Sequence, residues 1–110
     1  MIDALIGGRM YGAATARDGR NGQPFCTCKV RVPLVSGDCL FVNVICFEPP
    51  AIAALLALSD GDSVAISGEC TPKVYAPAQG DPRPVLDLKA HAVMTPYHVT
   101  RKRQATAEAG

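Results

Sequence analysis

Residues 39–50, CLFVNVICFEPP, restrict the possible folds of this chain more than any other stretch. In a β-strand successive side chains point to opposite faces, so Phe41, Asn43, Ile45 and Phe47 share one face. An antiparallel strand in a small protein normally has one buried face and one polar face. Here both faces are largely apolar, so the fold has to cover each of them. The face that we expect to form the core consists of Leu40, Val42, Val44 and Cys46.

The rest of the chain is predicted to form short strands and one helix. In residues 25–34 the side chains alternate in polarity, which places Lys29 and Arg31 on the outer face of a strand. Glycine and proline mark the turns, and the Ala- and Leu-rich residues 50–59 favour a helix that begins at a proline. The predicted strands are residues 2–16, 25–34, 39–48, 63–77 and 85–97.

This order of elements indicates the fold class and the domain boundaries. Five short strands interrupted by glycines predict an all-β protein built as a small closed barrel. A single short helix between the third and fourth strands is the layout of a five-stranded OB-fold Greek-key barrel. We assign residues 1–97 to this domain and residues 98–110 to a short, flexible basic tail.

The charge of the chain is close to balanced, with a formal net charge of +1. Without residues 101–110, which include Arg101, Lys102 and Arg103, eight basic and nine acidic residues remain and the net charge is −1. Any attraction for phosphate must therefore be local. No apolar run approaches the roughly 18 residues of a membrane span, and the N-terminus does not read as a signal peptide. We expect a cytoplasmic protein that does not bind membranes.

The five cysteines do not indicate a metal site or a disulfide framework. Cys26 and Cys28 share one face of a strand, but no second pair follows, and His91 and His98 lie far along the chain. We expect reduced, buried thiols and neither metal nor cofactor. No nucleophile elbow, H-E-x-x-H, G-x-G-x-x-G or P-loop is present. We therefore expect no enzymatic activity, no catalytic residue and no small-molecule substrate.

Several segments follow one another in an order known from one family. They are FVNVICF, AIAALLALSDGDSVAISG, the aromatic Tyr75 seven residues past Gly68, and VLDLKAHAV. In this order they resemble bacterial single-stranded DNA-binding protein, with a weaker match in MIDALIGGRM. The resemblance covers roughly residues 1–97. The primosomal replication protein N family, a related OB-fold that also binds single strands, is a close relative.

The resemblance implies a function and a set of site residues. Phe41, Phe47 and Tyr75 stand where the family's base-stacking aromatics stand, and such rings bind single strands with little sequence preference. We therefore expect single-stranded DNA binding in replication, recombination and repair, by a homo-oligomer (a dimer or a tetramer). Basic residues beside the rings would contact the phosphates, and the candidates are Lys29, Arg31, Lys73, Arg9, Arg20 and Arg83.

The residues leave an alternative open. The chain has no Trp, and Asn43 stands where the family often has a basic residue. Phe41 and Phe47 could instead be core or subunit-interface residues, and Lys29 and Arg31 a solvated face. The alternative function is an OB-fold protein–protein interaction module, such as a primosome or a phage or plasmid accessory subunit, with little DNA binding of its own.

Overall fold

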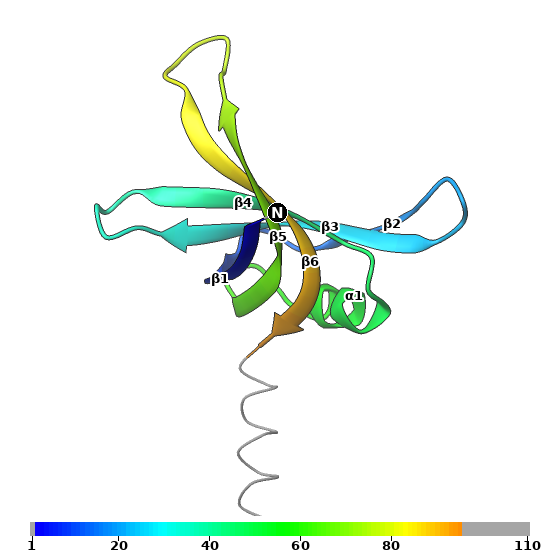
Figure 1. Ribbon diagram of the computed structural model, residues 1–110. Helices are drawn as coiled ribbons and strands as arrows, with labels where there is room; N and C mark the ends of the chain where they lie inside the picture. The colour runs from blue at the N-terminus through cyan, green and yellow to red at the C-terminus, as the bar shows by residue number, and fades with distance from the viewer. Residues whose placement is uncertain (1, 96–110) are drawn as a thin grey trace, which may run out of the picture.

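The computed structural model describes residues 2–95 and shows six strands and one helix (Figure 1). The prediction of a basic tail at 98–110 lies outside the described residues. None of the described helices is long and apolar enough to cross a membrane. In chain order the elements are β1 (Ile2–Met10), β2 (Thr15–Asp18), β3 (Pro24–Pro33), β4 (Cys39–Cys46), α1 (Pro49–Leu56), β5 (Ser63–Tyr75) and β6 (Arg83–Met94).

Five of these strands close into a barrel. The sheet order is β1-β5-β6-β4-β3-β2, and a further pairing of β1 with β3 joins the two sides. β4 and β6 are parallel, and the other pairs are antiparallel. α1 connects the third and fourth strands of the barrel, β4 and β5. The predicted five-stranded barrel and the position of its helix are confirmed. Beyond the barrel, the ends of β5 and β6 extend as a long hairpin (Figure 1).

The first predicted strand, residues 2–16, is divided in the structure. β1 ends at Met10 and pairs along most of its length with β5, whereas β2 pairs with β3. Between them Gly12 adopts a φ of +77°, and its backbone N–H donates to Asp60 Oδ1 at 2.7 Å. β2 also takes in Arg17 and Asp18, which lie beyond the end of the predicted strand 2–16. The predicted strand is divided because its two halves pair with different strands. β2, which pairs with β3, is the strand that lies outside the five-stranded barrel.

The core contains aliphatic and sulfur-containing side chains and no buried aromatic ring among residues 2–95. Val42, Val44 and Cys46 are buried as predicted, while Leu40 is half-buried. α1 begins with two prolines, which suit the first turn of a helix because the N–H groups there have no helical acceptor. The buried residues that it adds to the core are Ala51, Ile52 and Leu55.

The cysteines of β3 and β4 behave as core residues. Cys26 and Cys46 are opposite each other in the β3–β4 pairing, and both are fully buried. Burial raises the pKa of the Cys26 thiol to about 11 and that of Cys28 to about 12, with nearby thiols adding to the effect. All five cysteines are free. Because a thiol with so high a pKa is protonated at neutral pH, these side chains act as small hydrophobic groups.

We predict that Gly68, at the bulge between β5 and β6, does not tolerate a side chain. The register there shifts between Ser67 and Gly68, and a Cβ on Gly68 would overlap the carbonyl oxygen of Lys89. Since backbone would have to move, we expect Gly68→Ala to lower the free energy of unfolding by about 1–3 kcal/mol in urea denaturation. Gly7→Ala is the matched control, because its Cβ would meet nothing within 4 Å. Equal unfolding midpoints for the two variants would contradict the prediction.

Candidate functional site

The outer face of β3, β4, β5 and β6 is hollowed into a groove of about 750 Å³. Asn43 and Ile45 of β4 line it, so the middle of the second face of that strand borders the groove. Lys29 of β3 is opposite Asn43 on one side, and Asp87 of β6 is opposite it on the other. Side chains that are distant in the sequence are thus placed in one row by strand register.

One pair of aromatic rings lies at the Phe41 end of this face. The rings of Tyr11 and Phe41 meet edge to face, with their centroids 5.3 Å apart and their planes at 77°. Tyr11 follows β1 and lines the groove, whereas Phe41 is half-buried on β4. Arg31 of β3 is opposite Phe41 in the register and is exposed. A cation and two rings are therefore neighbours at this end.

A second pair of rings lies at the other end of β4. The centroids of Phe25 and Phe47 are 5.6 Å apart, and Phe47 is 45% exposed. The ammonium of Lys89, which also lines the groove, lies 5.8 Å from the centroid of the Phe47 ring. This is a cation–π distance, so the lysine is held beside an exposed ring. The alternative in which Phe47 belongs to the core does not hold, because the side chain is accessible to solvent.

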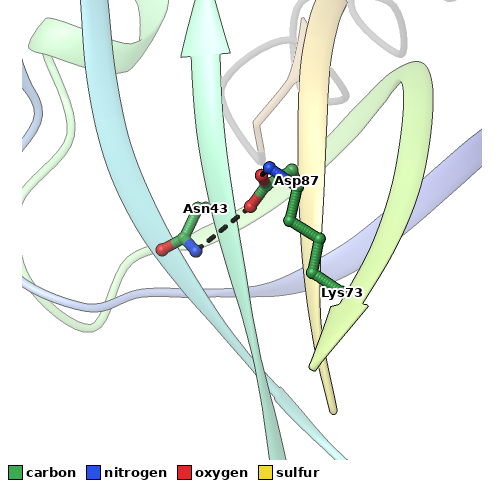
Figure 2. Close-up of polar contacts among 3 residues, drawn as sticks. All are labelled: Asn43, Lys73 and Asp87. Carbon is green, nitrogen blue, oxygen red and sulfur yellow. Dashed lines mark hydrogen bonds and ion pairs between the residues drawn. The ribbon is translucent and has the colours of Figure 1, made fainter. Parts of the chain in front are cut away.

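A polar network joins three strands in the middle of the face (Figure 2). The side-chain amide of Asn43 donates to Asp87 Oδ1 at 3.3 Å, and the ammonium of Lys73 forms an ion pair with Asp87 Oδ2. The hydrogen bond from Lys73 is the main reason that the pKa of Asp87 is lowered. Burial opposes it, while the hydrogen bond from Asn43 and the charge of Lys73 add smaller lowering effects. Asp87 is therefore ionised at neutral pH.

The remaining predicted residues lie around this face. Tyr75 is 57% exposed at the end of β5, opposite Arg83 in the hairpin. Arg9 is opposite Arg31 in the β1–β3 pairing, and its guanidinium donates to the carbonyl of Gly61 at 3.0 Å. Exposed Arg20 lies between β2 and β3. Of the nine predicted site residues, Lys29 lines the groove itself. Arg31, Phe41, Phe47 and Lys73 lie around it on the same face, and the other four, which do not line it either, are Tyr75, Arg83, Arg9 and Arg20.

Three residues of this face were missed in the sequence. The alternation of β3 does place Phe25 on the same side as Lys29, so its outward position could have been recognised. Lys89 could have been found in the same way, because it alternates with the core residues Leu88 and Ala90. Tyr11 follows the end of β1, where no periodicity applies, so no signal in the sequence indicated its contact with a ring on β4.

Comparisons with known proteins support the fold. No protein-family model matches the chain, and no curated protein sequence matches it significantly. Among solved structures, the small single-stranded DNA-binding protein from Streptomyces coelicolor superposes with a TM-score of 0.65 at 22% identity, over 86% of this chain and 93% of that one. The mitochondrial single-stranded DNA-binding protein of S. cerevisiae, Rim1, gives a TM-score of 0.66 at 17% identity, over 86% and 94%.

This chain has an OB-fold like that of these two solved structures. The predicted fold class is thereby confirmed: the chain has the predicted closed barrel with a single helix between its third and fourth strands, and it superposes on these structures over 86% of its length. At these low identities the likeness concerns the fold, and the function has to be argued from the groove itself.

We predict that the ionised Asp87 stabilises the fold above its ordinary pKa of 3.8 and ceases to do so in acid. Its pKa is lower in the folded chain, so protons bind the unfolded state more readily, and this stability is lost as the pH falls below about 3.8. In urea unfolding at about pH 6 and about pH 2.5, Asp87→Asn should lose less stability on acidification than the unmodified chain.

The matched control for this experiment is Asp81→Asn in the loop between β5 and β6. Asp81 has no hydrogen-bond or ion-pair partner within residues 2–95, and it carries the same charge on the same hairpin. We expect this variant to show the acid dependence of the unmodified chain. An acid dependence of Asp87→Asn indistinguishable from that of the control would refute the assigned role of Asp87.

Proposed function

We propose that this chain binds single-stranded DNA without strong sequence preference through the outer face of β3, β4 and β6. One observation carries the proposal: every aromatic side chain within residues 2–95 lies outside the core. Burying a Phe side chain normally contributes about 1.5–3 kcal/mol, so leaving every ring of residues 2–95 outside the core forgoes a large source of stability. The rings are Tyr11, Phe25, Phe41, Phe47 and Tyr75.

The chemistry of this face suits a single strand. Every nucleobase has a π-face, so exposed rings bind bases by stacking at about 1–3 kcal/mol each, with little dependence on sequence. Two ring pairs stand at the two ends of β4, and Tyr75 adds a ring on the hairpin. Lys29 lines the groove between them, and Arg31 is exposed beside Phe41. These cations are placed to contact phosphates while bases meet the rings.

The structural neighbours support the same proposal, since both are described as single-stranded DNA-binding proteins. In this proposal the chain is a binding protein rather than an enzyme, and it acts in DNA replication, recombination and repair in the cytoplasm. Phe41, Phe47 and Tyr75 stack on bases, and the predicted basic residues, together with Lys89, contact the backbone. Lys73 is the exception as long as its ion pair with Asp87 is kept.

We predict that the chain raises the fluorescence anisotropy of a labelled oligo-dT and that added salt weakens the complex. For single strands the logarithm of the affinity falls with that of the salt concentration by about 0.7 per neutralised phosphate. Tyr75→Ala and Phe47→Ala should each weaken binding by about 1–3 kcal/mol, or roughly 5- to 150-fold, because each removes one stacking ring.

Val74→Ala is the matched control for these variants. Val74 is 72% exposed on the same hairpin, but it precedes Tyr75 and points to the opposite face of the strand. We expect it to bind oligo-dT as tightly as the unmodified chain. Absence of binding at low salt would exclude the proposed function and favour the protein–protein interaction module.

We also propose that the chain is a homo-oligomer, in which β1 contributes to the interface. Ile2 and Leu5 are 54% and 75% exposed on β1. One edge of β1 pairs with β5, while the other meets β3 only at Arg9 and Met10. Residues 2–8 therefore have an edge that pairs with no other strand of residues 2–95. An edge strand with exposed apolar side chains is a ready site for another chain.

We predict a dimer or a tetramer in static light scattering of the purified chain. Leu5→Glu should shift the mass toward that of a monomer, because it places a charge in an apolar contact. The exposed Val35 of the β3–β4 turn provides the matched control, Val35→Glu, which should leave the mass unchanged. A monomeric mass for the unmodified chain would exclude the proposal.

A further inference from the structure

The negative charge of the Asp87 carboxylate is unfavourable for a groove that is proposed to bind a polyanion. It lines the groove from β6, and its side chain is 36% exposed, so a bound strand can reach it. A carboxylate repels phosphate and can only accept hydrogen bonds when it is ionised. The part of a nucleic acid that can meet it favourably is therefore a base edge that donates.

This carboxylate is fixed in orientation but not saturated (Figure 2). Asn43 donates to one of its oxygens at 3.3 Å, and Lys73 forms an ion pair with the other. An ionised carboxylate offers about four acceptor positions, so each oxygen keeps one for a further donor. Lys73 also offsets the negative charge, which lowers the cost of bringing DNA close. The two carboxylate oxygens of Asp87 are thus hydrogen-bond acceptors that are held in a fixed position in the groove.

The bases differ in what they can offer to such a pair. Cytosine and adenine each carry an exocyclic amine, and guanine presents an exocyclic amine beside a ring N–H. Thymine has one ring N–H between two carbonyl oxygens. These carbonyl oxygens repel a carboxylate oxygen that accepts from the N–H. Pairing of Asp or Glu with the cytosine amine is an established mode of base recognition. The ring pairs hold bases by their faces, which leaves the edges for polar groups.

We infer that Asp87, held by Asn43 and Lys73, gives the groove a modest preference for bases with an exocyclic amine over thymine. The inference rests on the proposed function and deepens it, since it adds a preference in base composition to sequence-tolerant stacking. Asp87 is then a residue that contacts the ligand, and Asn43 and Lys73 are the residues that position it.

The test compares oligo-dC with oligo-dT of equal length at the same salt concentration and at about pH 8, where cytosine is unprotonated. We expect the unmodified chain to bind oligo-dC roughly fivefold more tightly, the lower end of what one specific base contact contributes. Asp87→Asn should remove or reverse this ratio, because its amide also donates, and thymine offers acceptors. Loss of the negative charge affects both oligonucleotides alike, so the ratio isolates the base contact.

Asp81→Asn is the control, because it removes the same charge from the same hairpin at a position that does not line the groove. This variant should keep the ratio of the unmodified chain. Equal or tighter binding of oligo-dT by the unmodified chain, or a ratio that Asp87→Asn leaves unchanged, would overturn the inference and leave the proposed function intact. Failure to bind either oligonucleotide at low salt would overturn both.

Discussion

The pairing of β4 with β3 on one edge and with β6 on the other is the constraint on which the rest of the structure depends. This pairing directs one face of β4 into the core. It also decides which side chains of β3, β4 and β6 are neighbours on the groove face. Lys29, Asn43 and Asp87 form one row because their strands are in register, and Ile45 and Lys89 are neighbours in the next. A slip of one residue would exchange core and groove side chains, so stability and site geometry share one register.

The core is filled by side chains without aromatic rings, which explains why the rings are available for binding. The interior of a five-stranded barrel is narrow, and aliphatic and sulfur-containing side chains fill it, from Cys26 and Ala90 up to Leu55, Ile66 and Leu88. Rings on the inner face would overfill that space. The outer face has no such limit, and there the rings pack against one another rather than against the core. The narrow interior of the barrel thus explains both the side chains of the core and the position of the rings on the outer face.

The local sequence pattern predicted which side chains of a strand point inward and which point outward. It could not predict which strands pair with one another. Alternation along β3 and β4 was sufficient to place Val42 and Val44 inside and Lys29 outside, because it depends only on neighbouring residues. The division of residues 2–16 depends on which strand each half pairs with, a long-range choice without a local signal. The contact of Asp87 with Lys73 also depends on register across β5 and β6. The binding roles of the predicted site residues remain predictions.

The distribution of charge implies that stacking, rather than phosphate attraction, supplies most of the affinity in the proposed function. Of the cations on this face, Lys73 is occupied by Asp87, and Arg9 at its border is bonded to a backbone carbonyl. Lys29 and Arg31 have no such partner within residues 2–95, so few phosphates can be neutralised without breaking an existing contact. Each neutralised phosphate adds a salt-dependent increment, whereas each stacked base adds one that salt hardly affects. A chain with this charge balance therefore has to rely on its rings, which is consistent with their exclusion from the core.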